Sequence, residues 1–224
     1  MTVRYKLAPS ILAADFAHLA DHVGAVEPYS DQFHVDVMDG HFVPPITIGP
    51  VVVKALRRIT ELPLECHLMV TEPERQVEQF AEVGADSAVW HLESPPDPRP
   101  VLQLVRKLGM KAGLAINPET PFEAARPYLE EIDVLNVMTV NPGWAGQAFL
   151  RDVLPKIRAA RDHIDREGLE IDISVDGGVN LETARECLDA GANVLGAATA
   201  IFGQQDAGAA AAEMKRLLLG RASA

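Results

Sequence analysis

The sequence has few cysteines, few aromatic residues and no excess of positive charge over its 224 residues. Its two cysteines, Cys66 and Cys187, lie far apart, which favours reduced thiols in a cytoplasmic protein over a disulfide framework. A net charge of −12 disfavours nucleic-acid partners, because their phosphates are bound by clustered Lys and Arg. The chain starts without the apolar segment of a signal peptide, and no apolar run reaches membrane-spanning length. We therefore expect a cytoplasmic protein that binds neither nucleic acid nor membrane, and a small molecule remains as its partner.

What the sequence does contain is a regular alternation of short apolar runs with amphipathic stretches. Runs rich in Val, Ile and Leu lie near residues 7–12, 32–38, 64–70, 87–92, 111–116, 134–140, 171–175 and 194–199. This alternation is typical of βα units that build a parallel sheet. Eight units of similar length favour a closed barrel over an open doubly wound sheet. The fold class predicted is α/β, a single (β/α)8 barrel domain over residues 1–224.

Two segments between these runs have the composition of a helix start. Residues 71–74 (TEPE) and 120–123 (TPFE) each place a threonine three residues before a glutamate, with proline in the first turn. We expect a capping box at each, with Thr71 and Thr120 as the capping residues.

Polar residues near the ends of three apolar runs are the first candidates for chemistry. Strand alternation places His34 and Asp36 on one face of the second run, and Glu65 and His67 on one face of the third. Asp176 ends the seventh run, directly before a glycine pair. In a barrel of this kind the carboxyl ends of the strands meet at one mouth, where active sites lie.

Four of these side chains form a plausible ligand set for a divalent metal ion: His34, Asp36, His67 and Asp176. The alternative is that each is a separately hydrogen-bonded polar residue of the core. Convergence at one mouth favours the metal site, because a buried carboxylate is costly unless it is paired or binds a metal. A mixed His and Asp set suits Zn, Fe(II), Mn and Co equally.

The chemistry that such a site supports is proton abstraction beside a carbonyl. A metal ion acting as a Lewis acid stabilises an enediolate, and inversion of a carbon centre needs an acid and a base on opposite faces. Asp36 and Asp176 are the catalytic pair that we predict. Met38, Met69 and Met138 are expected to line the site and exclude water, although a methionine taken singly is more often a plain core residue.

Glycine-containing loops after the sixth and seventh runs predict a phosphate site. Residues 141–147 (NPGWAGQ) follow the sixth run, Gly177 and Gly178 follow the seventh, and Ala198 and Thr199 end the eighth. Barrels of this class often bind phosphate with backbone N–H groups of these loops. Turns also require glycine, so each loop alone is weak support for the site.

The residues resemble those of the ribulose-phosphate 3-epimerase family from about residue 7 to residue 202. The resemblance lies in five ordered blocks: 9–16 (PSILAADF), 34–44 (HVDVMDGHFVP), 67–70 (HLMV), 117–121 (NPETP) and 175–179 (VDGGV). It implies a divalent metal ion held by His34, Asp36, His67 and Asp176, epimerisation of D-ribulose 5-phosphate to D-xylulose 5-phosphate, and a homo-oligomer. The substrate contacts expected are Ser10, His67, Gly143, Trp144, Ala145, Gly146, Gly177, Gly178, Ala198 and Thr199.

The sequence departs from the family pattern at positions near the expected substrate. Pro45 stands where asparagine is usual, Ala145 interrupts the glycine loop, and Ala198 and Thr199 replace a Gly-Ser pair. The loop with Ala145 is similar to that of epimerases acting on allulose 6-phosphate, so this sugar is an alternative substrate with the same reaction.

Other classes of barrel protein fit the sequence less well. A Schiff-base aldolase needs a lysine at a carboxyl end of a strand, whereas Lys6 and Lys111 lie at strand starts and Lys54 in a helix. A metal-free decarboxylase needs alternating Lys and Asp at strand ends, and this pattern is missing. A non-catalytic sugar-phosphate-binding barrel remains the alternative from another class.

The remaining histidines are expected to have structural places. His18, His22 and His163 lie on predicted helices and are assigned to the surface. His41 and His91 are interpreted as structural residues, with a place behind the metal ligands as the alternative.

Overall fold

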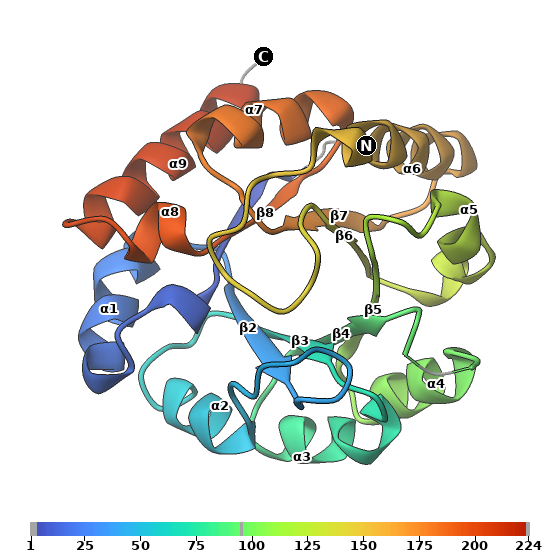
Figure 1. Cartoon of the computed structure of the whole chain (residues 1–224), viewed down its shortest axis with the longest axis horizontal. Coiled ribbons are helices and arrows are strands. Elements are labelled where there is room, and N and C mark those ends of the chain that lie inside the picture. The colour runs from blue at the N-terminus through green and yellow to red at the C-terminus, as the bar shows by residue number, and fades with distance from the viewer. Residues whose placement is uncertain (1–3, 95, 223–224) are drawn as a thin grey trace.

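A computed structural model describes residues 4–94 and 96–222 of the chain. It shows an eight-stranded parallel sheet in the order β1-β8-β7-β6-β5-β4-β3-β2, which curves into a barrel. In Figure 1 the helices form an outer ring around the strands, and the loop after β6, drawn in yellow, extends over the middle of the ring. The predicted (β/α)8 barrel is confirmed. That a single domain spans all of residues 1–224 stays a prediction.

The strands lie close to the eight predicted apolar runs. Their bounds are β1 Lys6–Pro9, β2 Phe33–Met38, β3 Leu64–Met69, β4 Ser87–His91, β5 Lys111–Ile116, β6 Val134–Met138, β7 Asp172–Asp176 and β8 Val194–Ala197.

The helices follow the strands in turn and cover the outside of the barrel. Their bounds are α1 Leu19–Val26, α2 Pro50–Leu56, α3 Val77–Glu82, α4 Arg99–Lys107, α5 Phe122–Ala125, α6 Leu154–Glu167, α7 Leu181–Ala190, α8 Thr199–Phe202 and α9 Ala207–Ala222. Short 3-10 turns lie at Ile11–Ala13, Phe16–His18, Glu27–Tyr29, Pro73–Arg75, Arg126–Glu131 and Arg151–Val153. No helix in the described part of the chain combines the length and the apolar character needed to cross a membrane.

The parallel register places candidate residues of neighbouring strands side by side. Asp36 of β2 pairs with His67 of β3, and Met38 pairs with Met69. On the other side of the barrel Met138 of β6 pairs with Asp176 of β7. Residues paired in parallel register face the same side of a sheet, so this register turns the candidate side chains of neighbouring strands towards the same side of the barrel wall, near one mouth.

The ring closes between β1 and β2 near the same residues. Ser10, directly after β1, forms a parallel bridge with His34 of β2. The backbone N–H of Asp31 also donates to the carbonyl oxygen of Leu7 over 2.9 Å. The closure of the barrel therefore lies beside one of the predicted metal ligands.

Several predicted boundaries were wrong. The first strand ends at Pro9 and not near residue 12, because the Ser10 side chain accepts a hydrogen bond from the Leu12 N–H and begins a 3-10 turn. The sixth and eighth strands end two residues earlier than the apolar runs suggested, at Met138 and Ala197.

The two predicted capping boxes were also wrong. Thr71 Oγ1 donates to Asp39 in the neighbouring loop after β2, and Thr120 Oγ1 donates to Glu93 in the neighbouring loop after β4. Neither the Pro73–Arg75 turn nor α5 has a side-chain cap. A capping box does occur at α7, where the Asn180 side chain accepts from the Thr183 N–H and Thr183 Oγ1 accepts from the Asn180 N–H.

Candidate active site

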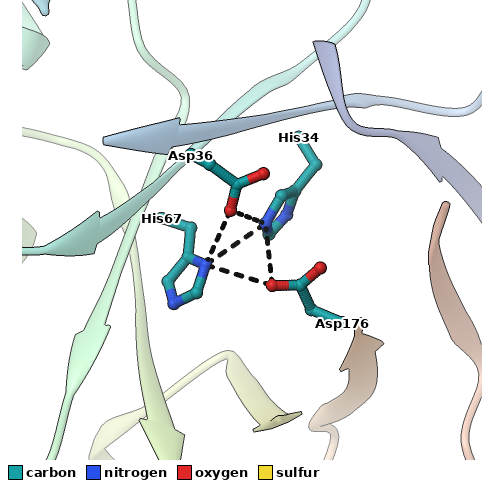
Figure 2. Close-up of side chains that lie close together, drawn as sticks. All are labelled: His34, Asp36, His67 and Asp176. Carbon is teal, nitrogen blue, oxygen red and sulfur yellow. Dashed lines mark hydrogen bonds and ion pairs between the residues drawn. The ribbon is translucent and has the colours of Figure 1, made fainter. Parts of the chain in front are cut away.

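The four predicted metal ligands meet at the carboxyl ends of β2, β3 and β7. One ligand atom from each of His34, Asp36, His67 and Asp176 lies within 4.8 Å of the others. Figure 2 shows the nitrogens of the two imidazoles between the two carboxylates, with Asp36 on one side and Asp176 on the other. The convergence that strand alternation predicted is therefore present in the structure.

The distances within this cluster resemble those of ligands around one small ion. Asp36 Oδ1 is 3.2 Å from His34 Nε2 and 3.1 Å from His67 Nδ1. Asp176 Oδ2 is 3.8 Å from the same His34 nitrogen and 3.4 Å from the same His67 nitrogen. Two imidazole nitrogens and two carboxylate oxygens are a usual donor set for a divalent transition metal ion.

The charge in the cluster also fits a dication. Asp36, Asp176 and Glu65 bring three buried carboxyl groups together, and no Lys or Arg in residues 4–94 or 96–222 pairs with them. Burial alone would lower the pKa of His34, but the negative charge of Asp36 and hydrogen bonds to Asp36 and Glu65 raise it well above its usual value. The site therefore attracts positive charge, whether as ring protons or as a metal ion.

The Asp36 carboxyl is held in its ionised form by these neighbours. Burial alone would raise the pKa of Asp36, but the charge of His34 and hydrogen bonds from His34 and His67 hold it below its usual range. The Ser10 hydroxyl donates to Asp36 Oδ2 over 2.5 Å, which leaves Oδ1 for the cluster. Asp36 is thus fixed in orientation with one oxygen facing the two histidines.

A second set of side chains supports the two histidines from behind. Glu65 Oε1 is 2.9 Å from His34 Nδ1. His91 Nε2 is 2.9 Å from His67 Nε2, and both rings are fully buried. Alternation had placed Glu65 on the face of His67 without assigning it a role. Of the two interpretations of His91 from the sequence, the place behind the predicted metal ligands agrees with its contact to His67.

A cavity opens above the cluster. Asp36 and Asp176 form part of its lining, together with the three predicted methionines. Of the predicted substrate contacts, those that line the cavity are Gly143, Trp144, Ala145, Gly146, Gly177, Gly178, Ala198 and Thr199. Ser10 and His67 are buried below it, and Pro45 does not line it. No lysine of the described residues lines the cavity, which disfavours the Schiff-base alternative.

The remaining predicted positions agree in part with the structure. His18 is exposed as expected, whereas His22 and His163 are half-buried and contact the aromatic rings of Phe202 and Phe122.

The turn after β7 depends on glycine at position 177. Gly177 has a φ of +108°, and a Cβ atom there would lie 2.3 Å from Val140 Cγ2. Replacing Gly177 by alanine is therefore expected to lower the free energy of unfolding by about 1–3 kcal/mol, measured by urea denaturation. Gly168→Ala is the matched control, because Gly168 has a φ of +67° with open space around it.

The control isolates the clash from the backbone strain. Gly168→Ala should cost about 1 kcal/mol from its left-handed conformation alone. Val140→Ala, added to the Gly177→Ala chain, should recover part of the lost stability. Equal losses at Gly177 and Gly168, with no recovery, would contradict this account.

Asp39 joins the loop after β2 to the loop after β3. Its carboxylate accepts the backbone N–H groups of His41, Phe42 and Thr71 and the Thr71 hydroxyl. Burial alone would raise the pKa of Asp39, but these hydrogen bonds lower it to about 2. The folded-state pKa is thus below that of an unfolded chain, so Asp39 stabilises the fold above about pH 4 and loses this effect as the pH falls towards 2.

Asp39→Asn is accordingly expected to have a pH-dependent effect. At neutral pH it should lower the free energy of unfolding by about 1 kcal/mol, a value discounted because solvent screens this partly exposed group. The difference from the wild-type chain should shrink between about pH 4 and pH 2. Urea denaturation at both ends of this range measures it, and a pH-independent difference would show that the charge of Asp39 has no role.

Comparisons with known proteins identify the family of this chain. The model of the ribulose-phosphate 3 epimerase family matches residues 6–202. A ribulose-phosphate 3-epimerase of Bacillus subtilis (strain 168) is 47% identical over 212 residues, which cover 94% of this chain and 98% of the relative. One of Synechocystis is 46% identical over 205 residues, 90% of this chain and 89% of the relative.

Solved structures add support for the fold alone. A crystal structure of 3-hexulose-6-phosphate synthase superimposes with a TM-score of 0.71 at 19% identity, covering 94% of this chain and 98% of the other. At 19% identity this similarity supports the barrel fold but gives no information on the reaction. The family match over most of the chain is what decides: the chain belongs to the ribulose-phosphate 3 epimerase family and is an epimerase.

Proposed function

We propose that this epimerase inverts C3 of a ketose phosphate and that its substrate pair is D-ribulose 5-phosphate and D-xylulose 5-phosphate. The observation that carries the proposal is the placement of Asp36 and Asp176 on opposite sides of the two histidines, at the floor of a cavity. Inversion of a carbon centre requires proton donors and acceptors on opposite faces, and two opposed carboxylates meet this requirement. The names of the similar proteins support the choice of sugar.

In the proposed reaction the two aspartates exchange roles between the two directions. One carboxylate removes the C3 proton from its face of the substrate, and the other, protonated, returns a proton to the opposite face. Ser10 keeps Asp36 turned towards the substrate through its hydrogen bond to Oδ2. Met38, Met69 and Met138 line the cavity and exclude water from the reacting carbon.

The residues that would hold a divalent metal ion are His34, Asp36, His67 and Asp176. When bound, such an ion supplies a Lewis acid that stabilises negative charge developing on substrate oxygens. Zn, Fe(II), Mn and Co all suit this donor set.

The phosphate group is assigned to the glycine-containing end of the cavity. Its proposed contacts are the loop at 143–146, Gly177, Gly178, Ala198 and Thr199, which all line the cavity. Ser10 and His67, which contact Asp36, are proposed as contacts of the remainder of the substrate. A homo-oligomer stays a prediction, as does the lack of nucleic-acid and membrane partners.

Isotope exchange tests the proposed reaction and the choice of sugar together. In deuterium oxide the enzyme should exchange the C3 hydrogen of ribulose 5-phosphate, followed by proton NMR. Faster exchange at C3 of allulose 6-phosphate would reassign the substrate to the hexulose, as Ala145 in the cavity lining allows. Tight binding of both sugars with no exchange in either would instead leave a sugar-phosphate-binding barrel.

A further inference from the structure

His91 of β4 lies directly behind one of the proposed metal ligands. Its Nε2 is 2.9 Å from Nε2 of His67, and the two rings stack with centroids 5.0 Å apart and planes inclined by 25°. The ring of Phe42 packs against His91 with centroids 4.8 Å apart. His91 is fully buried and does not line the cavity, so it has no direct access to a substrate there.

A hydrogen bond between two imidazole nitrogens needs one donor and one acceptor. Nδ1 of His67 faces Asp36 and Asp176, so this is the nitrogen that would bind an ion through its lone pair. The ring proton of His67 must then reside on Nε2, which donates to Nε2 of His91. His91 can accept this bond only if its own proton is on Nδ1.

Glu93 is placed to favour that arrangement. Nδ1 of His91 has no aligned hydrogen-bond partner, and the carboxylate oxygen facing it, Glu93 Oε2, is 3.4 Å away. Glu93 is itself held by the other oxygen, because Oε1 accepts the Asn117 N–H over 2.9 Å and the Thr120 hydroxyl. A negatively charged oxygen opposite Nδ1 attracts a proton to that nitrogen.

Each of the two candidate ligand histidines is thus supported by a carboxylate, one through a direct contact and the other through an intervening ring. Glu65 contacts His34 directly, whereas Glu93 reaches His67 through the ring of His91. We propose that His91, supported by Glu93, is a positioning residue that fixes His67 with Nδ1 free for the metal ion. This inference rests on the metal site of the proposed function and extends it to two residues outside the ligand set.

The test measures metal affinity and not turnover. The dissociation constant for Zn²⁺ is measured by competition with a chromophoric chelator in the wild-type chain and in His91→Phe, which keeps an aromatic ring but removes the acceptor. We expect binding to weaken by about 10- to 100-fold. His91→Gln, whose amide oxygen can accept the bond, should recover much of the affinity.

Val89→Ala is the matched control, because Val89 lies two residues from His91 in β4, is equally buried and pairs with His67 in the sheet, but its side chain offers His67 Nε2 no hydrogen-bond acceptor. It reports general loosening of the strand and should keep wild-type affinity. Wild-type affinity in His91→Phe overturns the proposal, as does a loss in Val89→Ala as large as that in His91→Phe.

Two further measurements test the proposal if the first variant does not fold. If His91→Phe does not fold, Glu93→Gln replaces it, and unchanged Zn²⁺ affinity there overturns the role of the pair. In the Zn²⁺-loaded wild-type chain, nitrogen-15 NMR should show the His67 proton on Nε2, and a proton on Nδ1 refutes the assignment. A wild-type chain that binds no Zn²⁺ removes the metal site and this inference together, whereas isotope exchange tests the reaction independently.

Discussion

Replacing Asp176 by asparagine is expected to lower kcat by about 10²- to 10⁴-fold, because asparagine keeps the shape of the side chain but cannot transfer a proton at neutral pH. The same size of loss is expected for Asp36→Asn. The two carboxylates share the same pair of histidines and form part of the lining of one cavity. Steady-state kinetics with ribulose 5-phosphate measures both effects.

The two variants should differ in the epimer whose C3 hydrogen they still exchange with solvent. When one carboxylate is lost, the epimer whose C3 hydrogen faces the other carboxylate should still exchange with deuterium oxide without inverting. Asp36→Asn and Asp176→Asn should therefore each lose exchange from a different epimer. Loss of exchange from the same epimer in both variants would contradict a role on opposite faces.

Asp172→Asn provides the matched control for these variants. Asp172 begins β7, the strand that Asp176 ends, and it pairs with Lys6 and Asn193 at the opposite end of the barrel. This substitution should cost stability and leave kcat close to that of the wild-type chain. A large loss of kcat here would mean that any disturbance of β7 stops the reaction.

Removal of the proposed metal ion is the second change with a large expected effect. Chelation followed by dialysis should abolish measurable epimerisation, and Zn²⁺, Mn²⁺, Co²⁺ or Fe²⁺ added back should restore it to different extents. The reason is electrostatic, because three buried carboxyl groups without a Lys or Arg partner among the described residues then face one another without the dication.

Stability provides an independent measure of the same site. An ion present at about one hundred times its Kd should add about 2.7 kcal/mol to the free energy of unfolding, so the chelated protein should unfold at lower urea concentration. The His34→Ala chain is the control, since it lacks one ligand and its stability should respond little to added ion. Equal stabilisation of both chains by Zn²⁺ would indicate binding elsewhere.

The barrel and the meeting of the four candidate ligands were both predictable from the sequence for simple reasons. Eight buried strands give eight apolar runs, and strand alternation alone puts His34 with Asp36 and Glu65 with His67. Which strands lie side by side follows from the barrel topology. Strand alternation and topology together are therefore enough to predict that these residues, far apart in the sequence, lie close together in the barrel.

What could not be predicted depends on partners in other loops. Thr71 and Thr120 have the spacing of helix caps, but their hydroxyls bind Asp39 and Glu93 from neighbouring βα units. The place of His91 behind His67 likewise depends on ring orientation in the packed barrel. A local pattern carries no information on a competing acceptor that arrives from a distant segment.

The order of the four candidate ligands along the chain would link a bound ion to the synthesis of the protein. His34, Asp36 and His67 lie in the first third of the sequence, whereas Asp176 ends β7 and joins them across the barrel. A chain emerging from the ribosome therefore carries three of the four ligands long before the fourth exists. The complete site forms only when β7 has paired with β6 and β8, so an ion that prefers the complete site favours the last step of barrel assembly.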